Sequence, residues 1–334
     1  MSRKMLLIKT SSLGDVVHAL PAVTDAYDRG IEIDWVVEEA FADIPKLHPG
    51  VKTVIPVAWR KWRSSLTGAG EEMRDFLSSL RANEYDLVLD SQGLVKSSLL
   101  ATMARGRSAG YSHTSAREPW ASFLYKDRCR VAKGGHAIER QRALFAAALG
   151  YEHDKVWSSG IERHAPENDQ VFLLHGTTWQ TKHWPEIMWI ELVRKIRAHG
   201  KEPLVTWGNE VERARAIKLV SEGAVLVERR PLGELIEVLA GCSTVITVDS
   251  GLGHLAAALG LRTIGLYAST SGDLTGCRGH RADYLQGQAH CAPCVRKSCT
   301  QYKGPELTWG NTVVDPPCFA SVNPDSVFEL SFGR

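Results

Sequence analysis

The chain of 334 residues is long enough for two domains of about 150 residues, each able to bury its own core. Its 44% hydrophobic and 23% charged residues are typical of a folded globular protein and exclude the collagen-like and disordered classes. A net charge of only +2 argues against a broad nucleic-acid-binding surface. No apolar run approaches the roughly 20 residues that span a bilayer, and the run 5–8 is too short for a signal peptide. We therefore expect a cytoplasmic protein, at most peripherally attached to a membrane, with no nucleic-acid partner.

Short apolar runs alternate with helical patterns along the first half of the chain, which indicates parallel sheets built from βαβ units. The predicted strands are residues 5–9, 31–37, 51–57 and 85–90. The predicted helices are residues 16–28, 71–82, 94–104 and 136–149. The polar segment 151–169 is the expected link to a second domain.

The second half of the chain also alternates strands and helices, until the alternation stops after residue 267. The predicted strands are residues 171–175, 203–207, 225–228, 244–248 and 263–267. The predicted helices are residues 185–199, 210–221, 231–241 and 323–332. Residues 268–318 are rich in Gly, Pro and Cys and are expected to be an ordered loop region. The sequence thus predicts an α/β protein of two doubly wound domains, whose ligands bind at the carboxyl ends of the strands.

The predicted domain boundaries follow from these patterns. Residues 1–160 form an N-terminal Rossmann-like domain, and residues 161–322 form a second one that includes a Cys-rich segment at 277–318. Residues 323–334 form a C-terminal helix and tail, which we expect to pack back on the N-terminal domain.

A turn with small residues, Gly14 and Asp15 follows the first predicted strand. The segment has neither the G-x-G-x-x-G dinucleotide motif nor the G-x-x-x-x-G-K-[ST] phosphate loop. Two interpretations of Asp15 remain open: it is the N-cap of the next helix, or a general base that takes a proton from an attacking hydroxyl.

Loops of the second half that follow strands carry groups suited to a nucleotide. Thr177, Thr178 and Lys182 offer two hydroxyls and a cation, as a pyrophosphate requires, or form an ordinary polar loop. The turn after the next strand carries Glu210 and Glu212, and an acidic residue there can accept hydrogen bonds from ribose hydroxyls.

The segment 244–260 reads as a buried strand, a glycine-bearing turn and an apolar helix. Helix starts of this kind favour anions because their backbone N–H groups are free and the helix dipole is positive there. Asp249, Ser250 and Gly251 lie in the turn, and His254 lies three residues after Gly251. The alternative is that Asp249 or Ser250 only caps the helix and that His254 is a core residue.

Basic residues of the first half are candidates for binding an anionic acceptor, although each alone also fits a solvated surface. In the segment 59–63, two tryptophans, Trp59 and Trp62, are interleaved with three basic residues and give the segment an interfacial character. The candidates are Arg60, Lys61, Arg63, Lys96 and Arg117.

Seven cysteines, an odd number, argue against a full disulfide framework. Four of them are clustered in the sequence: Cys291, Cys294, Cys299 and Cys318. They can form a structural zinc site, or they are free thiols or a redox-labile disulfide.

Six segments of the chain resemble the bacterial lipopolysaccharide core heptosyltransferases. They are KTSSLGDVVHALPA, WVVEEAFADIP, DSQGLVKSS, TSAREPWAS, TTWQTKHWP and VDSGLGHLAAALG, in this order within residues 5–267. The resemblance implies a GT-B glycosyltransferase with two Rossmann-like domains facing a central cleft. It implies transfer of L-glycero-D-manno-heptose from ADP-heptose to Kdo of Kdo2-lipid A, with inversion and without a catalytic metal or other cofactor.

The resemblance also implies roles for individual residues. Asp15 is the expected general base, and Thr177, Thr178 and Lys182 are expected to hold the pyrophosphate. Asp249, Ser250, Gly251 and His254 complete the donor site, and Glu212 binds the nucleoside. Arg60, Lys61, Arg63, Lys96 and Arg117 match acceptor-side positions. An enzyme of this kind is expected to be a monomer that contacts the inner membrane from the cytoplasmic side.

The chain departs from this resemblance beyond residue 270, where the C-x-P-C pattern and later cysteines are closer to the type II enzymes, which add the second heptose. The first-domain motifs, TSAREPWAS above all, favour the type I enzymes. Three alternatives remain: a type II enzyme, a non-catalytic nucleotide-sugar-binding or lipid-A-binding relative, and a nucleotide-sugar epimerase. Formation of product from Kdo2-lipid A alone distinguishes the type I enzyme.

Overall fold

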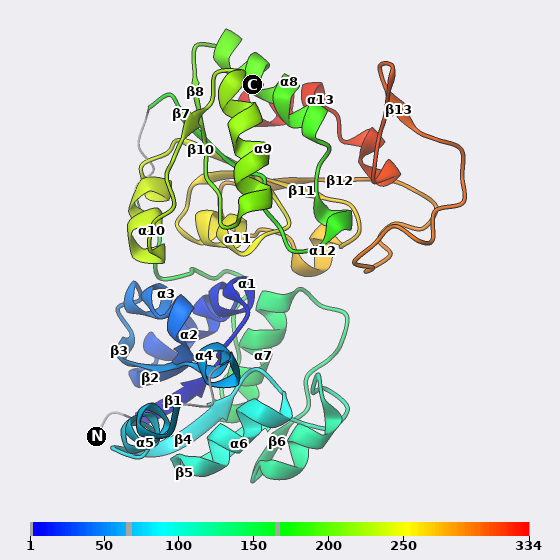
Figure 1. Cartoon of the computed structure of the whole chain (residues 1–334). Coiled ribbons are helices and arrows are strands. Elements are labelled where there is room, and N and C mark those ends of the chain that lie inside the picture. Colours follow the sequence, from blue (N-terminus) through cyan, green and yellow to red (C-terminus); the bar gives the residue numbers. More distant parts are fainter. Residues whose placement is uncertain (1–2, 65–68, 164–167, 334) are drawn as a thin grey trace. The chain divides into compact units, whose positions relative to one another are not determined.

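Two structural units make up the chain in this computed structural model, which describes residues 3–64, 69–163 and 168–333. Unit 1 is Met1–Ile161 and unit 2 is Glu162–Arg334, drawn in blue to green and in green to red (Figure 1). Each unit has its own six-stranded sheet, and all the strand pairs of both sheets are parallel. The predicted α/β class is therefore confirmed.

The sheet of unit 1 has the strand order β3-β2-β1-β4-β5-β6. Its strands are β1 Arg3–Ile8, β2 Ile31–Glu38, β3 Val51–Val57, β4 Glu84–Asp90, β5 Arg105–Tyr111 and β6 Asp127–Cys129. The first four match the predicted strands. The last two escape prediction because β5 begins with Arg-Gly-Arg and buries only its second half, and because β6 has three residues.

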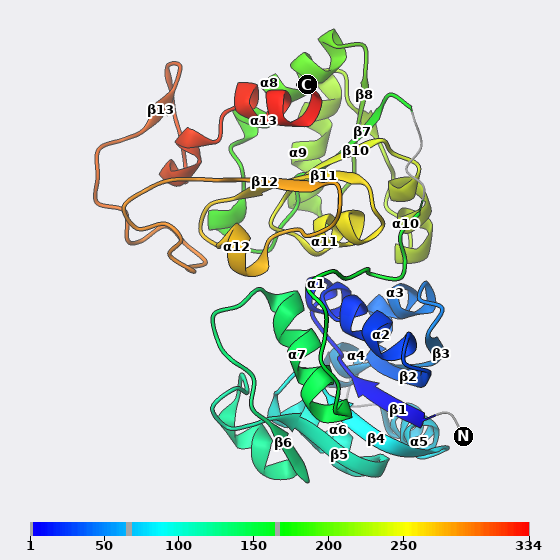
Figure 2. The same ribbon diagram turned by 180° about the vertical axis from the view of Figure 1, so that it is seen from behind.

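Helices cover both faces of this sheet. They are α1 Leu13–Val17, α2 Leu20–Tyr27, α3 Asp43–Lys46, α4 Trp59–Ser64, α5 Ala69–Leu80, α6 Val95–Met103 and α7 Ala137–Leu149, and a 3-10 helix, η2, spans Pro119–Leu124. In Figure 2, α2 and α7 lie side by side on the face toward the viewer. The single helix predicted at 16–28 is wrong, because the chain breaks it between α1 and α2, where Pro21 starts a new helix and cannot donate a backbone hydrogen bond.

A buried ion pair joins α2 to α7. Nε of Arg142 lies 2.7 Å from Oδ2 of Asp25, and Nη2 donates to Oδ1 over 3.2 Å. The Arg142 side chain is fully buried. Arg142→Met should therefore lower the free energy of unfolding by ~3–5 kcal/mol, because the carboxylate of Asp25 loses its buried partner.

Urea unfolding followed by circular dichroism would measure this loss. A double variant, Arg142→Met with Asp25→Leu, should recover part of the lost stability because no unpaired charge remains. A single variant as stable as the original protein would contradict a structural role for the pair.

The sheet of unit 2 has the strand order β12-β11-β10-β7-β8-β9. Its strands are β7 Gln170–Leu174, β8 Glu202–Val205, β9 Val225–Leu226, β10 Thr244–Val248, β11 Arg262–Tyr267 and β12 Ala282–Gln286. The first five match the predicted strands. The expectation of loops alone in residues 268–318 is wrong, since β12 pairs with β11 along Thr263–Tyr267. This edge strand is only partly buried and lacks an apolar run.

The helices of unit 2 are α8 Glu186–Ala198, α9 Glu210–Ser221, α10 Leu232–Ala240, α11 Gly251–Ala258, α12 Gly272–Thr275 and α13 Pro324–Phe332, with 3-10 helices η3 Gln180–Lys182 and η4 Pro317–Ser321. A short hairpin of β13 Thr308–Trp309 and β14 Thr312–Val313 lies in the Cys-rich segment. Whereas the sequence suggests that the last helix contacts the first domain, α13 packs against α8 and β11 within unit 2. In the described part of the chain, no helix is long and apolar enough to cross a bilayer.

Candidate active site

Several of the candidate residues follow strands at which a sheet reverses its strand order. In unit 1 the reversal lies between β1 and β4, and in unit 2 between β7 and β10. Loops that follow these four strands form the ligand-binding edge of a doubly wound sheet. Asp15 follows β1, Lys182 follows β7 and Asp249 follows β10. The topology therefore places the predicted donor and base residues at the edges where ligands bind in such folds.

Asp15 is half-buried in the third position of α1. Its Oδ2 accepts hydrogen bonds from both the backbone N–H and the hydroxyl of Ser12, each over 2.9 Å. The N-cap residue is Ser12, so the interpretation of Asp15 as the N-cap is wrong. Both of these bonds go to one carboxylate oxygen.

The charge of Asp15 is set by its neighbour Lys9, the residue after β1. Burial raises the pKa of Asp15, but the ammonium of Lys9 and the hydrogen bonds from Ser12 outweigh burial and lower that pKa to about 2. Lys9 itself is buried, which lowers its pKa, while the charges of Asp15 and Asp90 oppose that shift. Asp15 is therefore an ionised carboxylate at neutral pH, ready to accept a proton.

Removing Lys9 should shift the pH dependence of the proposed reaction. In Lys9→Met, burial acts on Asp15 without the opposing ammonium, so its pKa should rise. A protonated carboxyl cannot accept a proton, so kcat/KM should fall with decreasing pH at a higher pH than in the original protein. Rates between pH 4 and 8 would show this shift, and Lys52→Met, at an exposed position of β3, serves as the control. An unchanged acid limb would contradict the role given to Lys9.

Gln92 and Asp90 hold the loop after β4 against the loop after β1. Oε1 of Gln92 accepts from both the N–H and the hydroxyl of Thr10, each over 2.8 Å. The buried carboxylate of Asp90 accepts from Tyr125, Ser97 and the backbone of Gln92. The bonds from Gln92 to Thr10 hold the backbone that precedes Asp15.

The predicted acceptor-side cations differ in their surroundings. Lys61 forms an ion pair with Glu72, and the guanidinium of Arg60 lies 5.3 Å from the ring centroid of Phe41. Lys96 and Arg117 are exposed, and the charge of Arg117 acts on Lys9. The side chain of Arg63 lies outside the described residues.

Sequence reasoning missed one further cation, Arg140 in α7. It donates to the carbonyl of Ser115 over 3.2 Å, and its charge acts on both Lys9 and Tyr111. The charges of Asp15 and Asp90 also act on Tyr111. Arg140 thus belongs with Arg117 to the positive surroundings of the Asp15 site, although it comes from a helix whose sequence pattern indicates only an amphipathic surface.

In unit 2, Lys182 and Asp249 form a close ion pair. Nζ of Lys182 lies 2.7 Å from Oδ2 of Asp249, and their side chains are 16% and 9% exposed. The ammonium also lies 4.5 Å from the ring centroid of Trp179. The structure therefore brings together two donor-site candidates from loops that are far apart in the sequence.

Asp249 has two further partners. The hydroxyl of Thr270 donates to its Oδ2 over 2.7 Å, and Nε2 of His254 lies 3.6 Å from its Oδ1. Burial raises the pKa of Asp249, but His254 and Lys182 outweigh burial and hold it below its ordinary value. Burial lowers the pKa of His254, whereas Cys277 and Asp249 raise it to about 10. His254 is thus a buried but charged member of the site.

The hydroxyls of the donor loops are used in different ways. Ser250 is the N-cap of α11, and its Oγ accepts from the N–H of Gly253 over 3.2 Å. Thr177 donates to the carbonyl of Asp249 over 3.0 Å, while Thr178 is exposed. Gly251 is the first residue of α11. Ser250 is therefore the cap, and the capping interpretation of Asp249 is wrong.

Glu212 lies against the loop after β7. Its Oε2 accepts from the N–H of Gly208 over 2.8 Å, and a side chain at Gly176 would come within 2.7 Å of its carboxyl carbon. Glycine at 176 thus allows the first turn of α9, which carries Glu212, to approach the loop after β7. This brings Glu212 close to the loop that carries Thr177.

The four clustered cysteines lie in a segment that contacts the donor loops. The hydroxyl of Thr181 donates to the carbonyl of Arg296, and the N–H of Val295 donates to the carbonyl of Ser269 over 2.8 Å. Burial raises the pKa of Cys318 to about 12, with smaller contributions from the other three cysteines. Within residues 3–64, 69–163 and 168–333, no group of three or more His, Cys, Asp or Glu side chains is arranged to hold a metal ion.

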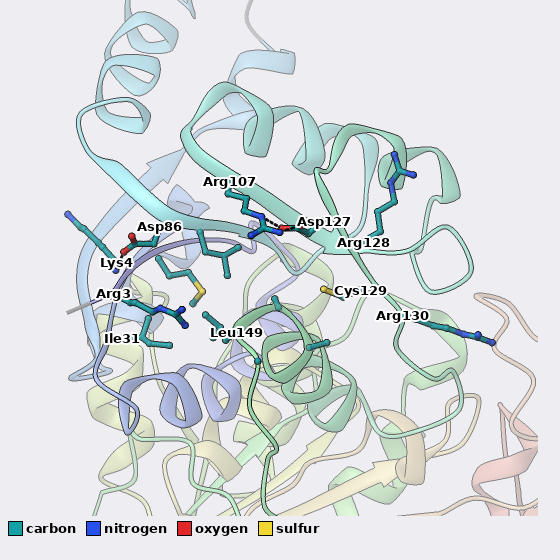
Figure 3. A pocket seen from close by; sticks show the side chains of 15 residues that line it. Arg3, Lys4, Ile31, Asp86, Arg107, Asp127, Arg128, Cys129, Arg130 and Leu149 are labelled. Atoms are coloured by element: carbon teal, nitrogen blue, oxygen red, sulfur yellow. Dashed lines mark hydrogen bonds and ion pairs between the residues drawn. The ribbon is translucent and has the colours of Figure 1, made fainter. Parts of the chain in front are cut away.

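A pocket of about 780 Å³ lies at the opposite edge of the unit 1 sheet, among the first residues of β1, β2 and β5. Figure 3 shows its mixed lining, in which Arg107 pairs with Asp127. Because this is the amino end of the strands, it is not the edge at which doubly wound folds bind ligands.

Comparison with known proteins shows the family of the chain. The family described as "Glycosyltransferase family 9 (heptosyltransferase)" matches residues 73–303. Lipopolysaccharide heptosyltransferase 1 of Pseudomonas aeruginosa is 44% identical over 97% of this chain and 96% of its own. The structures of E. coli heptosyltransferase WaaC with ADP and with ADP-2-deoxy-2-fluoro heptose give TM-scores of 0.80 and 0.77, each at 39% identity over 85% of this chain and 93% of theirs. The predicted GT-B fold is thereby confirmed, and the chain belongs to glycosyltransferase family 9, the heptosyltransferases.

Proposed function

We propose that this enzyme transfers L-glycero-D-manno-heptose from ADP-heptose to Kdo of Kdo2-lipid A with inversion. The observation that carries the proposal is Asp15, an ionised, half-buried carboxylate at the strand-order reversal of unit 1. The relatives named as heptosyltransferase 1 and the WaaC complexes with ADP and with an ADP-heptose analogue support the choice of donor.

The proposed donor site is the group around Lys182 in unit 2. Cleavage of the bond between heptose and ADP leaves negative charge on the pyrophosphate, so cations and N–H donors there stabilise the transition state. Lys182 and His254 supply positive charge, and the start of α11 at Ser250 and Gly251 supplies backbone N–H groups. Thr177 and Thr178 add hydroxyls, and Glu212 is proposed to bind the nucleoside.

The proposed chemical step uses Asp15 as the general base. A Kdo hydroxyl attacks the anomeric carbon of heptose, its proton passes to the carboxylate, and the bond to the ADP oxygen breaks on the opposite side. Attack from the side opposite the leaving group inverts the anomeric configuration. Arg60, Lys61, Arg63, Lys96 and Arg117 are the proposed contacts for the anionic acceptor.

An acceptor assay tests the proposal. Purified enzyme, ADP-heptose and Kdo2-lipid A should release ADP and give a product heavier by one heptose, without added metal. Product only from an already heptosylated acceptor would indicate the type II activity. Free sugar without acceptor would indicate an epimerase, and donor binding without ADP release from any acceptor would indicate a non-catalytic binding protein.

A structural zinc ion at Cys291, Cys294, Cys299 and Cys318 stays a prediction from the sequence. Burial raises the pKa of Cys299 and of Cys318, and the neighbouring cysteines add smaller contributions in the same direction. Metal analysis of the reduced protein should find one zinc per chain if they bind it, and Cys318→Ser should abolish that content. Metal-free protein with seven reactive thiols would refute the prediction.

A further inference from the structure

We propose that α6 and η2 of unit 1 form a membrane-docking face that binds a bilayer of anionic phospholipid. This α6–η2 face consists of the exposed apolar residues Val95, Leu99, Met103, Trp120, Phe123 and Leu124. The proposal rests on the proposed function only for the statement that the acceptor is a lipid.

The exposed apolar side chains are concentrated on these two elements. Trp120 is 75% exposed and Phe123 is 61% exposed, and their ring centroids lie 5.8 Å apart. Val95, Leu99 and Met103 follow one another at intervals of four residues and therefore lie along one side of α6. Contiguous exposed apolar surface of this kind marks an interaction site, whereas single exposed residues do not.

Buried contacts within unit 1 hold the α6–η2 face in place. Helix α6 packs against η2, and their inner residues Leu100, Ala101 and Ala121 belong to one buried cluster. The carboxylate of Glu118 accepts from the N–H of Val95 over 2.8 Å, which joins the start of α6 to the start of η2. The aromatic side chains therefore lie on an ordered surface, and docking requires no rearrangement of the buried cluster.

The segment that carries the α6–η2 face has a positive net charge. Residues 95–130 contain seven Lys and Arg and two Asp and Glu, a net charge of +5, while the chain as a whole carries +2. The remaining residues are therefore net negative. The guanidinium of Arg128 lies 5.7 Å from the ring centroid of Phe123, and Figure 3 shows Arg128 and Arg130 extending away from the Arg107–Asp127 pair.

This combination fits an anionic bilayer better than a second copy of the chain. Tryptophan and phenylalanine insert at the boundary between headgroups and acyl chains, and nearby cations are attracted to anionic headgroups. Each cation near such a surface contributes about 1 kcal/mol, which is about a fivefold change in binding. A symmetric dimer through this face would instead bring two copies of the same positive surface together.

The face also extends to the edge of the sheet that carries Asp15. Helix α6 starts directly after the loop that follows β4, where Val95 of the face adjoins Lys96. Arg117 comes just before η2, and its charge acts on Lys9 beside Asp15. A lipid acceptor can therefore stay in the bilayer while its sugar reaches the predicted acceptor cations.

Vesicle sedimentation of the full-length protein tests the proposal without any substrate. The protein should bind vesicles that contain phosphatidylglycerol and bind poorly to vesicles of phosphatidylcholine alone. Trp120→Ser with Phe123→Ser should weaken binding at least tenfold. Lys126→Ala, which removes an exposed cation two residues after η2, should weaken it about fivefold on anionic vesicles only. The control, Val211→Ser with Ile217→Ser, removes apolar side chains that are 73% and 48% exposed on α9 of unit 2 and should leave binding unchanged.

Three results would overturn the proposal: no binding of the original protein to anionic vesicles, equal binding by the Trp120/Phe123 variant, or a dimer of the original protein that this variant dissociates. Circular dichroism melting checks that the variant is folded. Its activity on a deacylated, water-soluble acceptor should be unchanged, whereas its activity on acceptor embedded in vesicles should fall. Absence of transfer to either acceptor by the original protein would refute the proposed function and leave the vesicle result standing.

Discussion

Asp15→Asn should lower kcat by a factor of about 10²–10⁴, the usual contribution of a general base. The amide oxygen of asparagine can still accept the hydrogen bonds that Ser12 donates, so the start of α1 should be preserved. It cannot take the proton from the acceptor hydroxyl. Steady-state rates with ADP-heptose and Kdo2-lipid A, together with the dissociation constant of ADP, would measure both effects.

The affinity for ADP should change little in Asp15→Asn, because Asp15 lies in unit 1 and the proposed donor site in unit 2. Asp28→Asn provides the control, since Asp28 is an exposed aspartate at the end of α2 in the same unit. Near-normal turnover by Asp15→Asn would assign the proton transfer to another group. A parallel loss of ADP affinity would instead indicate a misfolded protein.

Lys182→Met should lower kcat/KM for ADP-heptose by about 10²–10³, the range found when one group that stabilises developing negative charge is removed. The substitution removes a cation and also leaves the carboxylate of Asp249 without its partner at 2.7 Å. That carboxylate would then repel the pyrophosphate. ADP binding measured by calorimetry should weaken together with the rate.

A double variant separates the loss of the lysine charge from the repulsion by the unpaired carboxylate of Asp249. Lys182→Met with Asp249→Asn should bind ADP more tightly than Lys182→Met alone, because the repelling charge is gone. Lys218→Met is the matched control, since Lys218 forms an exposed ion pair with Glu186 in the same unit. If Lys182→Met binds ADP as well as the original protein does, Lys182 does not contact the pyrophosphate.

The sequence predicts the fold well wherever burial produces a regular pattern. Strand β10, Thr244–Val248, is buried along its whole length, and the sequence predicts it with its observed bounds. The sequence does not predict β5, because three of its four buried residues, Ser108 to Gly110, are small and do not form an apolar run. Strand β12 was missed because an edge strand is only partly buried and needs few apolar residues.

The sequence likewise predicts some residues of the candidate site but not the contacts between them. Asp15 and Lys182 stand in polar turns after strands, which a local pattern can reveal. The link between Thr10 and Gln92 joins positions 82 residues apart, and that between Lys182 and Asp249 depends on the neighbouring positions of β7 and β10. Lys9 was overlooked as a site residue because it ends a predicted strand, although its buried charge sets the pKa of Asp15. Such contacts follow from the strand order, which no local pattern contains.

The ion pair between Lys182 and Asp249 has a consequence for turnover. Because the ammonium already has a carboxylate partner, a nucleotide that binds at the proposed donor site would compete with Asp249 for it. The carboxylate would then pair with the ammonium again when ADP leaves. Under the proposed function, we therefore expect the pair to favour rapid departure of ADP over tight retention.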